Sequence, residues 1–542
     1  FRLAACRSFF DIFGPVDAMK QLALKLLCYT RQLIDLFTNF IFGFIHGRSP
    51  GRNVLPDVCD LILLESAVAL AKKIRLRKIS SVEVVESYIN RICDINPVLN
   101  CCVDRRFEEA LQDAKLADEF ISNNLHRVED LEIEKPFLGV PFTVKVSLPV
   151  KGLIHTAGLC ARKDIKADFN APVVENLIKA GAIPVAVSNV SEFCMWWESY
   201  NNVHGRTYNP YDLSRIAGGS SGGEACLQSS AGSPMGIGSD IAGSIRVPAF
   251  FNGIFGHKPT SGVVSNEGQI PVPHGDLDNY LCTGPLSRFA CDLAPMLKVM
   301  ACRNEELLKL EEKVDISKLN LYYMESDGGG LFVTPVQQDI KKSLHQVIKH
   351  LQQAHGVKAK QIRLSNMKYA MFFWVAKILE VESPQLCERL NEKGKVNMPL
   401  ELVKWLLWMS RFTLPTIAIG LGERLIPGIQ SEFFQNLLIA YKDLKLELDT
   451  LLGNNGVLLY PPHPTVAPYH HQPLFMPFNI AYSVLFNILG YPVTQCPLGL
   501  NADGLPLGIQ IVSAKYNDRY CLAVASELEK AFGGWVCPTS VL

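Results

Sequence analysis

The chain has 542 residues, of which 48% are hydrophobic, and it carries 53 basic and 53 acidic side chains. This composition excludes an intrinsically disordered chain, and the balanced charge argues against a nucleic-acid partner, which requires a basic surface. The 16 cysteines contain no C-x-x-C pair, so their spacing predicts neither a metal site nor a redox motif.

The N-terminal segment, residues 1–50, is predicted to form a membrane-associated helix, with residues 1–18 left unassigned. Its longest uncharged run, Leu36–Ile45, is shorter than the roughly 20 residues that a transmembrane helix needs. A tilted membrane anchor and an amphipathic helix in the membrane interface therefore both fit, and a helix packed on the protein body is a third alternative. A cleaved signal peptide fits less well because no small-residue cleavage site follows.

Helices and strands alternate through the first half of the chain, which indicates an α/β fold. Apolar spacing predicts helices between residues 60 and 116, one of them with an N-cap at Ser80 and Ser81. The segments "FLGVPFTVKV" and "GAIPVAVSNV" are predicted strands, and the helix-like "PVVENLIKAGA" overlaps the start of the second.

The second half contains a charged, mainly helical region over residues 305–452, which we regard as variable. Within it, residues 400–425 have almost no polar face, which indicates a membrane-facing cap, a buried helix or a dimer interface. Three further strands are predicted in "GVLLYPPHPTVAP", "LGYPVTQCPLGL" and "LPLGIQIVSAKYND", before a last helix in "RYCLAVASELEKAFGG".

Residues 217–260 are unusually rich in glycine and serine. A phosphate-binding loop would need Gly-Lys-Ser or Gly-Lys-Thr, and "GGSSGGEAC" has no lysine at that place. The dinucleotide-binding pattern and the G-x-S-x-G nucleophile turn are also missing. Two common uses of such a segment remain: to let chain segments pack closely, and to present backbone N–H groups to an oxyanion.

Three motifs carry a family resemblance: "GVPFTVK" ending at Lys145, "GGSSGG" at residues 218–223, and "DIAGSIRVPA" at residues 240–249 followed by "GHKPT". Together they resemble the amidase signature family. This resemblance implies an α/β fold in which a large twisted mixed β-sheet is surrounded by α-helices, with a catalytic domain over residues 60–540. It also implies a serine hydrolase without a cofactor.

The resemblance further implies a Ser-Ser-Lys triad, with Ser244 as nucleophile, Ser220 as bridging serine and Lys145 as base. A lysine can serve as base only if burial lowers its pKa, and Lys145 ends an apolar strand. The oxyanion donors would be the backbone N–H groups of Ile241, Ala242, Gly243 and Ser244. The peptide bond between Gly219 and Ser220 is expected to be cis.

Two residues depart from the family pattern. Ala242 replaces a glycine, which the loop tolerates only if φ there is negative. Val146 replaces a common acidic residue, so a charge that orients Lys145 must come from elsewhere. Asp240 and Arg246 are expected to form a buried ion pair that braces the nucleophile loop. The three histidines of "HPTVAPYHH" have no acidic or cysteine neighbour, and we predict no metal.

Within the family, strings such as "SEFCMWWES", "YPPHPTVAPYHH" and "FGGWVCP" are most similar to fatty-acid amide hydrolases, especially those of the second type. The implied reaction cleaves acylethanolamides and primary fatty amides to a fatty acid and an amine. Alternatives are a general small-amide amidase, an amidotransferase-like subunit and a lipid-binding pseudoenzyme. Candidate substrate-lining residues, any of which could equally be core, are Phe193, Met195, Trp196, Phe250, Phe251, Leu485 and Phe486.

The expected partners are a lipid amide substrate, a membrane surface and, if the chain self-associates, a second copy in a homodimer. The expected location is an intracellular membrane, either the endoplasmic reticulum or a lipid droplet.

Overall fold

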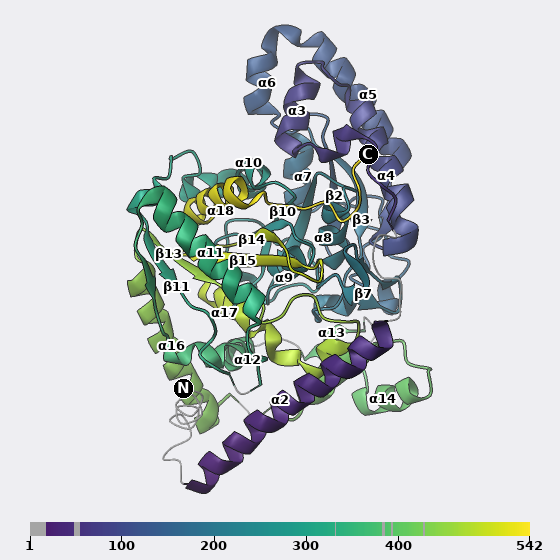
Figure 1. Ribbon diagram of the computed structural model, residues 1–542. Coiled ribbons are helices and arrows are strands. Elements are labelled where there is room, and N and C mark those ends of the chain that lie inside the picture. The colour runs from purple at the N-terminus through teal and green to yellow at the C-terminus, as the bar shows by residue number, and fades with distance from the viewer. Residues whose placement is uncertain (1–17, 48–54, 331, 382–384, 392–393, 427–428) are drawn as a thin grey trace.

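A computed structural model describes residues 18–47, 55–330, 332–381, 385–391, 394–426 and 429–542. An 11-stranded mixed β-sheet forms its centre, with strand order β1-β3-β2-β8-β10-β9-β14-β15-β13-β11-β12. Helices surround this sheet, as the sequence predicts; α3, α5 and α6 gather at one end of the molecule, and α2 and α14 lie near the opposite end (Figure 1).

The strands of the large sheet are β1 (Cys102–Arg105), β2 (Pro141–Lys145), β3 (Ile183–Ser188), β8 (Met235–Asp240), β9 (Phe255–Lys258), β10 (Cys282–Ser287), β11 (Asn320–Tyr323), β12 (Ala359–Gln361), β13 (Gly456–Tyr460), β14 (Val493–Leu500) and β15 (Pro506–Ser513). Strand β2 is parallel to β3 and β8, and all five of its residues are buried. Burial on both faces is typical of parallel strands covered by helices. Two small hairpins pair β4 (Tyr200–Asn201) with β5 (Gly205–Arg206) and β6 (Tyr208–Asn209) with β7 (Asp212–Ile216).

The helices up to the nucleophile segment are α2 (Ala18–His46), α3 (Ala67–Arg75), α4 (Ser81–Leu99), α5 (Phe107–Asn123), α6 (Val128–Glu134), α7 (Pro172–Lys179), α8 (Gly222–Ser229) and α9 (Arg246–Phe251). The later ones are α10 (Ala290–Ala301), α11 (Gln338–His355), α12 (Ala370–Glu380), α13 (Leu386–Arg389), α14 (Met398–Leu406), α15 (Leu414–Gly422), α16 (Glu432–Leu452), α17 (Ala481–Leu489) and α18 (Asp518–Phe532). Ser80 caps α4, and its side chain and that of Glu83 form a reciprocal capping box, which confirms the predicted helix start.

Residues 305–452 are mainly helical but also contribute β11 and β12 to the sheet. These strands have four and three residues and pair in parallel at the sheet edge, β11 with β13 and β12 with β11. Such short segments carry too little alternation to stand out from the charged, helical sequence around them.

Helix α2 turns the side chains of Arg31 and Asp35 toward the protein. The Arg31 guanidinium donates to the backbone carbonyl of Phe475 at 2.5 Å and to the Thr334 hydroxyl at 3.1 Å, and it pairs with Asp35 at 2.7 Å. Asn39 accepts a hydrogen bond from Gln472. The opposite side exposes large apolar side chains, namely Leu26, Tyr29, Leu33, Leu36, Phe37, Phe40, Phe44 and Ile45.

No helix in the described part of the chain is both long enough and apolar enough to cross a membrane. Residues 1–17 of the predicted N-terminal segment lie outside the described residues.

Candidate active site

Lys145 ends the buried strand β2, where its side chain is fully buried, as the sequence predicts. Its Nζ lies 2.6 Å from the Ser220 Oγ and 3.0 Å from the Ser239 Oγ. Burial lowers the pKa of Lys145, while the neighbouring Cys194 thiol and the Asp240 carboxylate act in the opposite direction. A buried lysine that contacts a serine hydroxyl can act as a base once it is neutral.

The segments that carry Ser220 and Ser244 meet where the start of α8 approaches the loop after β8. The Ser221 backbone N–H donates to the Ser244 carbonyl at 3.2 Å, and the peptide bond between Gly219 and Ser220 is cis, as expected. Ser220 is 1% exposed and Ser244 is 7% exposed. Within the described residues the Ser244 hydroxyl makes no hydrogen bond, so the contact that links Ser220 to Lys145 is not continued to Ser244 in this state.

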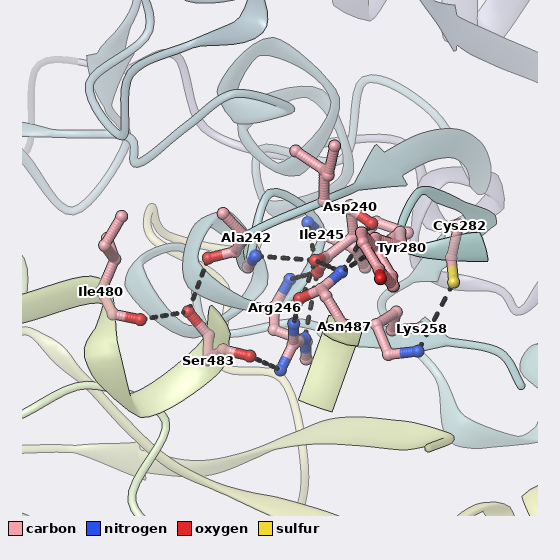
Figure 2. A network of polar contacts seen from close by, with 12 residues as sticks. Asp240, Ala242, Ile245, Arg246, Lys258, Tyr280, Cys282, Ile480, Ser483 and Asn487 are labelled. Atoms are coloured by element: carbon pink, nitrogen blue, oxygen red, sulfur yellow. Dashed lines mark hydrogen bonds and ion pairs between the residues drawn. The ribbon is translucent and has the colours of Figure 1, made fainter. Parts of the chain in front are cut away.

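Asp240 and Arg246 brace the nucleophile loop, which confirms the predicted buried pair (Figure 2). Arg246 Nη2 and Nε lie 3.0 Å from the two carboxylate oxygens of Asp240, and both side chains are fully buried. Although burial alone would raise the pKa of Asp240, the Arg246 charge and the hydrogen bonds from Arg246 and Asn487 hold it well below its usual range. Asp240 is thereby held as an anion under the loop.

Helix α17 supplies two further supports that sequence reasoning missed (Figure 2). The Ser483 hydroxyl donates to the Ala242 carbonyl at 2.8 Å, and Asn487 Nδ2 donates to the Asp240 carbonyl at 2.8 Å. Their spacing of four residues places both on one face of the helix. That spacing is the only sequence signal, and it does not reveal which loop the face would meet.

The four proposed oxyanion donors are not equivalent. The Gly243 N–H donates to Asp240 Oδ1 at 2.7 Å, so this predicted donor is already engaged in this state. Among the described residues, the N–H groups of Ile241, Ala242 and Ser244 have no hydrogen-bond partner.

The loop also explains why one glycine is replaceable and the next is not. Ala242 is absent from the residues with positive φ, so its side chain is tolerated, whereas Gly243 has φ +114°. A Cβ at Gly243 would lie 2.2 Å from the Ser483 Oγ.

Glu224 is the missing acidic neighbour of Lys145. It lies on α8, is fully buried, and accepts a hydrogen bond of 2.8 Å from the Thr143 hydroxyl. Thr143 and Lys145 are two residues apart on β2 and so face the same side of the strand. Burial raises the pKa of Glu224 to about 7, partly offset by hydrogen bonds and the Lys145 charge. The sequence placed this glutamate inside the Gly/Ser motif but gave no sign that it lies behind the lysine.

The candidate substrate-lining residues fall into two groups. Met195 and Trp196 are half-buried, and Trp196 packs in the same cluster as Ile241 and Ala242. The others are buried in the protein core: Phe193, Phe250, Phe251, Leu485 and Phe486. Bulky apolar side chains beside a catalytic motif look alike in sequence whether they line a channel or fill the core.

Glu192 connects this region to helices α14 and α15. Its Oε2 accepts hydrogen bonds of 2.8 Å from both the backbone N–H and the hydroxyl of Thr413, the N-cap residue of α15. Both side chains are buried, and the adjacent Phe193 packs with Met398 and Ile417 in one apolar cluster. The segment that precedes the Gly/Ser motif is thus fixed to these two helices.

The end of α14 and the turn after it expose their apolar side chains to solvent. Trp408 is 97% exposed, and Leu406, Leu407 and Met409 are exposed as well. This exposure excludes burial in the core for the end of α14, whereas Phe412 and Ile417, farther along the predicted segment, are buried.

The histidines of "HPTVAPYHH" have other partners. The His463 Nδ1 lies 2.8 Å from the Thr465 carbonyl, and the His470 Nδ1 lies 3.1 Å from Glu198. His471 contacts Arg206 at 2.6 Å. In the part of the chain that the structure describes, no three His, Cys, Asp or Glu side chains are placed to hold a metal.

Comparisons with known proteins agree with this geometry. The sequence profile described as Amidase matches residues 83–522. The chain is 48% identical to fatty-acid amide hydrolase 2 of Homo sapiens over 89% of its own length and 91% of that protein, and 46% identical to fatty-acid amide hydrolase 2-A of Danio rerio over 91% and 93%. A solved structure titled "Fatty acid amide hydrolase" shares the fold with a TM-score of 0.69 and 23% identity, covering 88% of this chain and 86% of that one.

Proposed function

The chain belongs to the amidase family, and from this premise we propose that it hydrolyses the amide bond of fatty-acid amides. Identity of 46–48% to two fatty-acid amide hydrolases over about nine-tenths of each chain is the observation that carries the choice of substrate. The buried contact of Lys145 with Ser220 supports the choice of chemistry, because it supplies the base that a serine nucleophile needs.

The proposed first step is a proton relay. Neutral Lys145 accepts the proton of Ser220, Ser220 accepts the proton of Ser244, and the Ser244 oxygen attacks the amide carbonyl. For this step the Ser244 hydroxyl must turn to Ser220, and its freedom from other hydrogen bonds permits that rotation. The relay then runs backward and protonates the amine as the C–N bond breaks, leaving an acyl-enzyme that water hydrolyses.

The proposed oxyanion site consists of the backbone N–H groups of Ile241, Ala242 and Ser244. The loop that carries them is held by two hydrogen bonds, one from the Gly243 N–H to Asp240 and one from the Ser483 hydroxyl to the Ala242 carbonyl. The donors therefore need no rearrangement when charge develops on the substrate oxygen.

The lipid substrate is proposed to enter from a membrane that the protein contacts with two apolar surfaces. One is the outer side of α2, where Phe40 is 73% exposed, and the other is the α14 end around Trp408. Both lie at the same end of the molecule (Figure 1). An apolar helix side that faces away from the protein, with Arg31 and Asp35 turned inward, fits an interfacial helix.

A fluorophosphonate labelling experiment on the full-length chain tests the proposal. We expect covalent labelling of the wild-type protein, none of Ser244→Ala, and protection by a long-chain acylethanolamide but not by acetamide. As a matched control, Ser265→Ala removes an exposed serine outside the site and should label normally.

Three results would point elsewhere. Labelling of Ser244→Ala would reject the nucleophile, and equal protection by acetamide would favour a general small-amide amidase. Absence of labelling in a protein that still binds acylethanolamide would favour the lipid-binding pseudoenzyme.

A further inference from the structure

Two arginine side chains are buried in the same part of the core, and neither is one of the proposed catalytic residues. Arg91 lies on α4 and is 3% exposed, and Arg288 follows β10 and is fully buried. Burial lowers the pKa of Arg91, Cys537 and Asp94 act in the opposite direction, and the positive charge of Arg288 adds to the lowering. Two buried cations that repel each other require compensation from their surroundings.

The contacts of Arg91 are all to neutral groups and leave one nitrogen free. Nε donates to the carbonyl of Ser230 at 2.9 Å, and Nη1 donates to the carbonyls of Pro56 and Asp57 at 2.8 and 3.2 Å. Nη2 is buried and has no hydrogen-bond partner among the residues that the structure describes.

Arg288 is less well satisfied. Its Nη2 donates to the Tyr88 hydroxyl at 3.1 Å, and its guanidinium lies over the Trp535 ring at 5.0 Å. Nε and Nη1 are both buried, and within the described ranges neither has a hydrogen-bond partner. An aromatic face offsets part of the charge but accepts no in-plane hydrogen bond.

Several contacts bring the Arg91 and Arg288 side chains into one region of the core. Tyr88, which contacts Arg288, lies one turn before Arg91 on α4, so both point from the same helix face. Arg91 donates to the carbonyl of Ser230, while Trp535, which covers Arg288, donates to the adjacent carbonyl of Ser229 at 3.0 Å. The Ser229 hydroxyl is also buried and unpartnered in the described part of the chain.

The acidic side chains nearby neutralise this pair only in part: Asp292 attracts Arg288 and Asp94 attracts Arg91, but neither forms an ion pair with it. Among described residues, no carboxylate lies within 4.0 Å of either guanidinium. The Asp292 carboxylate is committed to the N–H groups of Ala67 and Val68, and Asp94 is exposed on α4. A water molecule could satisfy the free donors but would leave two positive charges buried, whereas an anion does both.

We propose that a small monovalent inorganic anion, chloride in most solutions, binds between Arg91 and Arg288. A halide suits the place because the surroundings are buried and aromatic, which favours a small, weakly hydrated ion over a doubly charged phosphate. The bound ion joins α4, the segment after β10 and the C-terminal segment at Trp535. It is a structural ligand that lies outside the proposed catalytic machinery.

Thermal unfolding of the full chain in different sodium salts tests the site, at one ionic strength and one detergent concentration. We expect chloride and bromide to raise the Tm by about 3 °C over gluconate, with saturation, whereas phosphate at the same ionic strength gives no such rise. Arg91→Met should abolish the halide dependence. Arg127→Met, which removes an exposed and paired arginine, should keep it.

Crystals of the wild-type protein grown in bromide provide a test that needs no variant. An anomalous peak between the Arg91 and Arg288 guanidinium groups is the expected result. A Tm that is equal in gluconate and halide, or a density at this place that scatters only as water, would overturn the proposal.

Discussion

Replacing Glu224 by glutamine should remove a loss of folding stability that the wild-type protein undergoes as the pH rises. Burial raises the pKa of Glu224 to about 7 from its ordinary value of 4.5. The folded state therefore holds this proton more tightly than the unfolded state does, so the associated stability is complete below pH 4.5 and is lost as pH rises through 7. A gap of 2.5 pKa units corresponds to about 3 kcal/mol of unfolding free energy.

Glutamine keeps the shape of the side chain and can still accept the hydrogen bond from the Thr143 hydroxyl. We expect the free energy of unfolding of the wild type to fall by about 3 kcal/mol relative to Glu224→Gln between pH 4.5 and pH 8. Urea unfolding at half-unit pH steps measures this difference. Glu119→Gln, at an exposed position of α5, is the matched control and should follow the wild type.

The same change should also shift the catalytic pH profile. The Glu224 carboxylate favours the charged form of Lys145, so its removal lowers the pKa of Lys145 further. The acidic limb of the kcat/KM profile should then move to lower pH. Parallel stability curves for the wild type and Glu224→Gln, or an unmoved acidic limb, would refute the role given to this carboxyl group.

Three further predictions concern the site and its attachment. Lys145→Met should lower kcat by about 10⁴-fold, while near-UV circular dichroism should show that the fold is preserved. A kcat within tenfold of the wild-type value would exclude the lysine as base. Gly243→Ala should destabilise the chain by about 2 kcal/mol and lower kcat, because φ at this position is positive and the new Cβ would meet the Ser483 hydroxyl. Adding Ser483→Ala to the same chain should restore part of the lost stability, and no recovery would contradict the steric cause. Glu192→Leu should leave the Thr413 N–H unpaired, while the Thr413 hydroxyl keeps its contact with the Thr416 hydroxyl, at a cost of about 2 kcal/mol. Proteolysis near α15 should become faster, with Glu192→Gln milder, and equal proteolysis of the two variants would contradict the tether.

Motifs predicted the reacting groups better than their surroundings. The resemblance assigned Lys145 and Ser220, and their contact in the structure follows from a strand end and a helix start that the sequence marks clearly. The family prediction is confirmed by the match over residues 83–522. The roles of the individual catalytic residues stay predictions until the labelling and kinetic experiments are done.

Supports that come from distant parts of the chain could not be predicted. Ser483 and Asn487 reach the nucleophile loop from more than 200 residues away, and nothing local in α17 indicates that contact. Glu224 is visible in the motif, but its proximity to Lys145 depends on how α8 packs on β2. The strands β11 and β12 were missed for a related reason, since their pairing partners, not their own residues, make them strands.

The inward-facing polar side of α2 has a mechanical consequence. With 29 residues at about 1.5 Å each, the helix is roughly 44 Å long, so on a flat membrane it would touch along a line and not at a point. A contact along a line would fix the direction of the helix axis on the membrane, but it would leave the rest of the protein free to rotate about that axis. Helix α14 lies away from the axis of α2 (Figure 1), and the exposed residues around Trp408 would provide a second, separate contact with the membrane. A line and one point outside it define a plane, which here is the membrane surface. Because Arg31 fastens the helix to the catalytic body, the whole enzyme would keep one tilt relative to the bilayer, and the distance that a substrate travels to the catalytic serine would be constant.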